Sequence, residues 1–159
     1  MCGIAGQISS DPRKITRGHD IFCKMQQSLS RRGPDQRGMY ENGCAALIHA
    51  RLAVVDLENG RQPMILDRAG ERYVLVYNGE LYNTPELREE LVACGHRFLG
   101  HSDTEVLLHG YEQWGKELPA RLRGMFTFVI WDRASHTMFG ARDIFGIKPF
   151  YYYNVDGLF

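Results

Sequence analysis

The chain begins Met1-Cys2-Gly3-Ile4-Ala5-Gly6-Gln7, with a cysteine directly behind the initiator methionine. The small cysteine side chain allows that methionine to be removed, which would leave Cys2 with a thiol and a free α-amine. These groups titrate near pH ~8.5 and ~7.7–8.0, and a chain-terminal nucleophile can be activated by its own amine. The alternative is an ordinary start codon followed by a buried, inert cysteine in an edge strand.

The composition is typical of one globular domain. Acidic and basic residues balance at 19 each, which argues against nucleic-acid or membrane-surface binding through bulk charge. No apolar run approaches the ~18–20 residues of a membrane span, and no charged-then-apolar leader is present, so we expect a cytoplasmic protein. The cysteines are widely spaced without a CxxC pair, which favours free thiols over a zinc site. They are Cys2, Cys23, Cys44 and Cys94.

The predicted elements are strands, then helices, then strands, an order that is typical of an α+β domain with mainly antiparallel pairing. The pattern predicts strands at residues 4–9, 39–40, 73–77, 125–131, 138–142 and 150–153, with another beginning at 158. Residues 44–49 and 52–56 are short apolar runs that Arg51 interrupts. Helical spacing of apolar residues predicts helices at residues 16–30, 84–94, 103–114 and 118–122.

Local signals refine the first part of this pattern. Thr16 is expected to cap the first helix, whose buried face would carry Ile21, Met25 and Leu29. The pair 42–43 is Asn-Gly, the preferred sequence of a two-residue hairpin turn.

Similar signals mark the middle helices. Leu87, Leu91 and Val92 form the expected buried stripe of the helix that starts near residue 84. Residues 102–105 fit a capping box for the next helix, which Gly115 should end.

Several polar residues stand where apolar ones would be easier to accommodate. Arg51 lies between two apolar runs, and a buried cation requires a partner. That partner is either a structural acid or the carboxylate of a substrate, which a guanidinium binds with two parallel hydrogen bonds.

The pair Asn78-Gly79 directly follows a buried strand. It is either a plain turn or a pair of N–H donors for a developing oxyanion. Asp103 is a helix cap that could also face a cationic amine, and Glu80 is either a solvated turn residue or a second amine partner.

The histidines show no metal-ligand spacing, so we predict no metal site. His96, His101 and His109 do not lie at i, i+4 on one helix, and no carboxylate cluster joins them in the sequence. No nucleophile-elbow motif and no phosphate-binding Gly-rich loop is present either. If the chain is an enzyme, Cys2 is its best nucleophile.

With these residues assembled, the sequence resembles the glutaminase domain of class II glutamine amidotransferases of the asparagine synthetase type. The matching stretches follow one another along nearly the whole chain. They are residues 1–6, 32–35, 51–56, 62–64, 77–83, 102–105, 124–126, 141–143, 146–149 and 151–152.

The resemblance implies an N-terminal-nucleophile (Ntn) hydrolase fold, with two stacked, mainly antiparallel sheets flanked by helices. It also implies that Cys2 attacks the side-chain amide of L-glutamine, with its α-amine as the proton shuttle. The side chain of Asn78 and the N–H of Gly79 would form the oxyanion hole. Arg51 would hold the α-carboxylate of glutamine.

The same resemblance places Glu80 and Asp103 opposite the α-amine of glutamine. It also implies that a stretch of backbone lines the substrate pocket. That stretch is Leu52, Ala53, Val54 and Val55.

In this family a second, C-terminal synthetase domain uses ATP and Mg²⁺ to aminate aspartate with ammonia that arrives through an internal channel. We therefore expect residues 1–159 to be a glutaminase domain, truncated at its C-terminus, that needs no cofactor of its own. Pairing as a homodimer is a further expectation. The alternatives are a relative that aminates another acceptor, or a non-catalytic module of the same fold that binds an amino acid or a partner.

Overall fold

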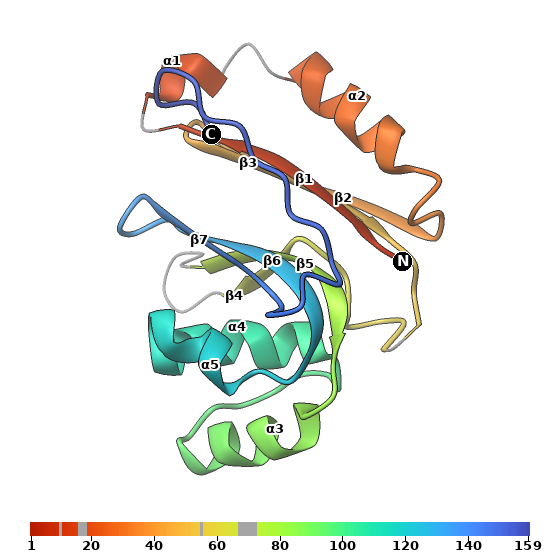
Figure 1. Ribbon diagram of the computed structural model, residues 1–159, viewed down its shortest axis with the longest axis vertical. Coiled ribbons are helices and arrows are strands. Elements are labelled where there is room, and N and C mark those ends of the chain that lie inside the picture. Colours follow the sequence, from red (N-terminus) through yellow and green to blue (C-terminus); the bar gives the residue numbers. More distant parts are fainter. Residues whose placement is uncertain (10, 16–18, 55, 67–72) are drawn as a thin grey trace.

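Two antiparallel sheets lie face to face in this computed structural model, which describes residues 1–9, 11–15, 19–54, 56–66 and 73–159 (Figure 1). The first sheet has the order β1-β3-β2, and the second has the order β4-β5-β6-β7. The strands are β1 (Gly3–Ile8), β2 (Gln36–Asn42), β3 (Ala45–Arg51), β4 (Met64–Leu66), β5 (Tyr73–Leu81), β6 (Gly124–Asp132) and β7 (Thr137–Arg142). The predicted α+β fold with two stacked sheets is confirmed.

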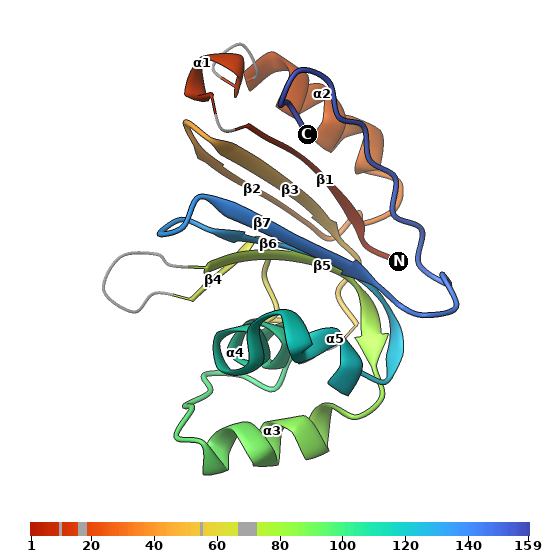
Figure 2. The ribbon, with the colours of Figure 1, turned by 60° about the vertical axis from the view of Figure 1, so that its left-hand side comes forward.

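Helices cover the outer faces of both sheets (Figure 2). The first sheet is covered by α1 (Pro12–Ile15) and α2 (His19–Leu29). Below the second sheet lie α3 (Thr84–Ala93), α4 (Asp103–Trp114), the 3₁₀ turn η1 (Gly115–Glu117) and α5 (Leu118–Arg121). Among the described residues, no helix is long and apolar enough to cross a membrane.

The side chains of the central strand β5 point alternately into two parts of the core. Val74 and Val76 pack between the sheets, whereas Leu75 and Tyr77 pack toward the helices of the second sheet. Successive side chains of a strand point to opposite faces, so Asn78 lies on the same face as Val76. That alternation directs Asn78 into the space between the sheets.

The prediction that a strand ends at Tyr77 is wrong, because β5 continues through Asn78 and Gly79 to Leu81. Along this extension Asn78 pairs with Thr127 of β6. The continuous partner strand outweighs the local turn preference of an Asn-Gly pair. Glycine is required at position 79, because a Cβ there would collide with the backbone of β6.

Other predicted strands also differ from the structure. The run at 52–56 forms no strand in its described residues, because β3 ends at Arg51. Residues 150–153 form no strand either, and the short strand β4 was not predicted. The predicted strand start at 158 is present as isolated bridges, and Phe159 exchanges two backbone hydrogen bonds with Ile8.

The first predicted helix, at 16–30, corresponds to α2, and its expected cap, Thr16, lies outside the described residues. The short helix α1, which precedes it, was not predicted. Ile21 is 47% exposed, and the fully buried Phe22 takes its place in the core. A face formed by Phe22, Met25 and Leu29 packs on the first sheet. The periodicity of the helix was therefore right, but its inward face begins one residue later.

The helices of the second layer follow their sequence signals more closely. Leu87 and Leu91 are buried, but Val92 is 54% exposed and does not belong to the stripe. Helix α4 has the predicted bounds, with the Ser102 hydroxyl accepting the Glu105 N–H at its start. The Glu105 carboxylate is used elsewhere, so only half of the predicted capping box forms.

The hairpin between β2 and β3 is present, but its turn is shifted by one residue. Asn42 pairs with Ala45, which leaves Gly43 and Cys44 as the two turn residues. The Asn42 side-chain oxygen accepts the N–H groups of Cys44 and Ala45 at 3.3 and 2.9 Å. Asn42 therefore closes the turn with its side chain.

His49 joins the two sheets and should make stability depend on pH. It is fully buried on β3, and its Nε2 lies 3.1 Å from the Tyr77 carbonyl on β5. Burial lowers the pKa of His49 from 6.5 to about 4, with the Arg51 charge acting in the same direction and the Tyr77 carbonyl opposing both. The folded state thus holds a neutral imidazole that the unfolded chain would protonate.

The unfolding free energy should therefore fall as pH drops from 6.5 toward about 4. We expect His49 to contribute a loss of about 2 kcal/mol between about pH 6.5 and about pH 5. In urea unfolding experiments at these pH values, the free energy of unfolding should fall less for His49→Gln than for the parent. His101→Gln, which alters an exposed histidine, is the control, and equal losses for the parent and His49→Gln would contradict this account.

Candidate functional site

Cys2 stands at the start of the edge strand β1, half-buried and held by contacts from distant parts of the chain. Its Sγ lies 3.7 Å from the Leu52 carbonyl oxygen, and its own carbonyl accepts a hydrogen bond from Arg32 Nε at 3.3 Å. Met1 is 61% exposed. The thiol therefore has a defined position, while the residue in front of it remains accessible.

Cys2 and Asn78 line the same pocket, which has a volume of about 540 Å³ and lies between the two sheets. Its walls include Ile4, Val76 and Val129, so most of the surroundings are apolar. Within the described part of the chain, the Asn78 amide makes no hydrogen bond. Its N–H donors are therefore available to a group that develops negative charge near the thiol.

The backbone N–H of Gly79 faces the outer edge of β5, away from β6. N–H groups alternate between the two edges of a strand. The N–H groups on either side of it, those of Tyr77 and Leu81, bond to Gln62 Oε1 at 2.6 Å and Asp103 Oδ2 at 3.3 Å. The short strand β4 ends its pairing at Leu75. Gly79 thus presents a second donor beside Asn78.

Arg51 is only 4% exposed and is fixed by oxygens of strand β2 and of the loop that follows β3. Its guanidinium donates to Gln36 Oε1 at 2.8 Å, the Leu57 carbonyl at 3.1 Å and the Asp56 carbonyl at 2.6 Å. These three acceptors are neutral oxygens that fix the orientation of the guanidinium. Gly60 is required beside it, because a Cβ there would collide with the guanidinium.

Asp103, the first residue of α4, accepts a hydrogen bond from the Tyr77 hydroxyl at 2.7 Å. Burial raises the pKa of Asp103. Burial also raises the pKa of Tyr77 well above its usual value, and the charges of Asp103, Glu80 and Cys2 add to the effect. Asp103 is therefore the direct partner of this phenol, on which the charges of Glu80 and Cys2 also act.

The loop after β3, whose residues 56 and 57 bind Arg51, is called the Arg51 loop. It is hydrogen-bonded to the start of α4 and to the residues just before it. Asp56 Oδ2 accepts the His101 N–H at 2.6 Å, and Gln62 Nε2 donates to Thr104 Oγ1 at 3.3 Å. Backbone hydrogen bonds, chiefly from His101, lower the pKa of Asp56. These contacts bring the Arg51 loop against the segment that carries Asp103, so a cation and an anion are held on adjoining segments.

The predicted pocket-lining backbone is only partly assembled around Cys2. Leu52 contacts the thiol, and the Ala53 N–H donates to Asp35 Oδ2 at 2.8 Å. Val54 is 77% exposed, and Val55 lies outside the described residues. The residues predicted to bind the amino-acid head group do not line the 540 Å³ pocket that contains Cys2. They are Arg51, Glu80 and Asp103.

Sequence reasoning missed the residues that position these groups. Gln36 and Tyr77 were not predicted to hold Arg51 and Asp103. The Arg-Gly-Pro-Asp stretch at 32–35 served only as a point of resemblance, yet its two charged residues bind Cys2 and Ala53. A Gly-Pro pair between two charges was the signal that could have pointed to them.

A family model described as the glutamine amidotransferase domain matches residues 1–159. The chain belongs to this family. The amidotransferase domain is 45% identical over 152 residues to asparagine synthetase (glutamine-hydrolyzing) 3 of Bacillus subtilis (strain 168), a match covering 96% of this chain and 25% of that relative. It is 40% identical over 152 residues to a probable asparagine synthetase (glutamine-hydrolyzing) of Dictyostelium discoideum, covering 95% and 27%.

The amidotransferase domain spans about a quarter of the length of these curated relatives. Among solved structures, it matches a glutamine phosphoribosylpyrophosphate amidotransferase from B. subtilis complexed with ADP and GMP. That match has a TM-score of 0.54 and 24% identity, and it covers 88% of this chain and 31% of that chain. The likeness concerns the fold, and it confirms the predicted Ntn-hydrolase architecture.

Proposed function

We propose that this amidotransferase domain hydrolyses L-glutamine to glutamate and ammonia with Cys2 as the nucleophile. The observation that carries the proposal is the shared pocket of Cys2 and Asn78, in which the Asn78 amide has no other hydrogen-bond partner among the described residues. Membership of the glutamine amidotransferase family supports the choice of substrate.

In the proposed reaction, the Cys2 thiolate attacks the amide carbon of glutamine. The oxygen becomes negatively charged and accepts hydrogen bonds from Asn78 Nδ2 and the Gly79 N–H. The α-amine of Cys2 carries the thiol proton to the departing nitrogen, and ammonia leaves. Water then hydrolyses the glutamyl thioester to glutamate and regenerates the thiol. This scheme requires removal of Met1, whose exposure makes it accessible to an aminopeptidase.

The head group of glutamine carries one negative and one positive charge. We assign the α-carboxylate to Arg51, because a guanidinium binds a carboxylate with two parallel hydrogen bonds and neighbouring oxygens hold the Arg51 head group in place. We assign the α-amine to Asp103 and Glu80, whose charges both act on Tyr77. The backbone of residues 52–55 is proposed to line the space between the two ends of the substrate.

In the whole protein we propose that the ammonia is used to convert aspartate to asparagine. The curated relatives are named as glutamine-hydrolyzing asparagine synthetases and are about four times as long as this chain. A C-terminal synthetase domain that uses ATP and Mg²⁺ would then be the partner of this domain. A homodimer and a cytoplasmic location remain predictions, as does the choice of aspartate over another acceptor.

The test is to measure glutamate and ammonia in equal amounts from L-glutamine, using protein whose intact mass shows that Met1 is absent. The matched comparison is a variant with one extra residue inserted between Met1 and Cys2. In this variant the cysteine is not the first residue of the chain. The processed protein should release glutamate and the extended one should not. Equal release from both, or none from the processed protein, would contradict the proposal.

Asp103→Asn should raise KM for glutamine, roughly tenfold to hundredfold, with a smaller change in kcat. The amide cannot balance the charge of the substrate α-amine. Because burial raises the pKa of Asp103, kcat/KM of the parent should fall as the pH drops through a value above the usual aspartate range. Asp103→Asn should lack that acid limb. Steady-state glutamate release checks both expectations, with Asp20→Asn on α2 as the control.

A further inference from the structure

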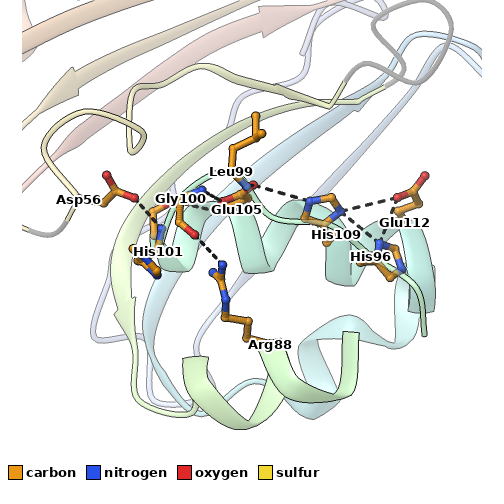
Figure 3. A network of polar contacts seen from close by, with 10 residues as sticks. Asp56, Arg88, His96, Leu99, Gly100, His101, Glu105, His109 and Glu112 are labelled. Carbon is orange, nitrogen blue, oxygen red and sulfur yellow. Dashed lines mark hydrogen bonds and ion pairs between the residues drawn. The ribbon is translucent and has the colours of Figure 1, made fainter. Parts of the chain in front are cut away.

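Two histidines and a glutamate that take no part in the proposed hydrolysis meet in the helical layer below the second sheet (Figure 3). His109 and Glu112 lie on α4, and His96 lies in the turn that follows α3. His96 is 7% and His109 is 3% exposed, and the Glu112 side chain is 15% exposed. A buried group of this kind requires an explanation, since polar side chains are costly to remove from water.

The three ligand atoms have the spacing of a metal site. His96 Nδ1 lies 3.1 Å from His109 Nδ1 and 3.4 Å from Glu112 Oε2, and the remaining distance, from His109 Nδ1 to Glu112 Oε2, is 3.8 Å. A tetrahedral zinc ion with bonds of about 2.0–2.1 Å has neighbouring ligand atoms about 3.3–3.4 Å apart. The cluster therefore already forms three corners of such a tetrahedron.

The outer nitrogens of both rings are oriented as metal-bound histidines usually are. His96 Nε2 lies 3.0 Å from Gln113 Oε1, an acceptor, so this nitrogen carries the proton. His109 Nε2 faces Glu105 Oε1 at 3.9 Å. In the tautomer with both protons on the outer nitrogens, each Nδ1 has a lone pair free to bind a metal, and the two Nδ1 atoms lie beside the Glu112 carboxylate. Outer partners of this type fix the tautomer of metal-binding histidines.

The second layer around the cluster is itself rigid. Glu105 accepts the N–H groups of Leu99 at 2.6 Å and Gly100 at 2.9 Å. These hydrogen bonds hold the Glu105 carboxylate in a defined position opposite the His109 ring. His109 and Glu105 also line a pocket of about 470 Å³, so one member of the cluster borders an open cavity.

We propose that His96 Nδ1, His109 Nδ1 and Glu112 Oε2 bind a divalent transition-metal ion of the zinc class. Water would complete the coordination. Three neutral or anionic donors converge on one point, and a divalent cation satisfies all of them together. The sequence predicted no metal here because His96 and His109 lie 13 positions apart on different elements. The turn after α3 brings them together.

Such an ion would fasten the turn at 95–101 to α4. The same turn carries His101, whose N–H binds Asp56 beside the Arg51 loop (Figure 3). The site is therefore a structural support that lies outside the Cys2 pocket. It does not depend on the assignment of glutamine hydrolysis.

The direct test uses tag-free protein, dialysed against a chelator and then titrated with Zn²⁺ alone in competition with a chromophoric indicator. We expect about one equivalent of zinc per chain and, at a hundredfold excess over Kd, a rise in Tm of roughly 5–10 °C. Co²⁺ in place of Zn²⁺ should give the intense visible bands of four-coordinate cobalt.

Variants separate this site from adventitious binding. Glu112→Gln and His109→Asn should no longer bind the one tight equivalent of zinc. Gln113→Ala removes the side chain that contacts His96 Nε2 and should weaken the affinity for zinc roughly 10–100-fold. His101→Gln alters an exposed histidine outside the cluster and should bind as the parent does. Circular dichroism checks that each variant is folded.

The proposal is overturned if the folded parent takes up no zinc and its Tm does not change, which would leave a proton shared between the two rings. It is equally overturned if Glu112→Gln, folded, binds as tightly as the parent. Because zinc uptake is measured directly on the parent protein, the proposal can be refuted even if a variant fails to fold.

Discussion

Replacing Cys2 with alanine is expected to reduce glutamate release from L-glutamine by roughly 10⁴–10⁶-fold, to the level of the buffer. The variant retains the pocket and the free α-amine, because alanine is also small enough for Met1 to be removed. It loses only the atom that forms the thioester. A coupled assay for glutamate measures the rate, and intact mass verifies that the terminus is processed.

Two further cysteine variants sharpen this result. Cys2→Ser should also lose most activity, because a hydroxyl is far less acidic than a thiol. Cys23→Ala, which removes an exposed free thiol on α2, should leave the rate unchanged. If Cys2→Ala released glutamate as fast as the parent, the nucleophile would have been assigned wrongly.

Asn78→Ala is expected to lower kcat roughly 10²–10³-fold with little change in KM. The Asn78 amide would stabilise charge that develops only after attack, so its loss should affect the transition state more than substrate binding. Steady-state kinetics with protein of verified mass provide the measurement. The fold should be kept, because β5 remains paired with β6 through its backbone.

Thr127→Val is the matched control for Asn78→Ala. Thr127 pairs with Asn78 on β6, lines the same pocket and is buried. The substitution conserves volume and removes a hydroxyl from the neighbouring position. If it lowered kcat as much as Asn78→Ala, or if Asn78→Ala raised KM alone, the assignment of Asn78 to the oxyanion hole would be wrong.

The parts of the fold that local chemistry decides could be predicted from sequence. Helix α4 has the expected bounds because Ser102 caps it and Gly115, at φ 54°, ends it. Apolar runs separated by turn residues predict most of the strands, whereas the stacking of two sheets was an implication of the family resemblance. The extension of β5 through Asn78-Gly79 could not be foreseen, because only the pairing with β6 holds an Asn-Gly pair in a strand.

The candidate site could likewise be predicted only in part from the sequence. Arg51 could be recognised from the sequence as a buried cation that needs partners, but an acid or a substrate carboxylate was expected. Its described partners include a side-chain amide and two carbonyls, from residues 36, 56 and 57, which the sequence did not point to. Such contacts depend on how a loop folds back, which no local pattern encodes. The meeting of His96 with His109 was hidden for the same reason.

The outer edge of β5 has a consequence for the length of side chain that the site can accept. Gly79 and Leu81 present their N–H groups at this edge two residues apart, and Asp103 sits at the second of them. At about 3.4 Å per residue, the two positions are roughly 7 Å apart. In the proposed reaction, one position takes the carbonyl oxygen and the other marks the α-amine. Asparagine, one methylene shorter, would reach the amine partner without bringing its amide to the donors, so the strand itself would discriminate between the two amides.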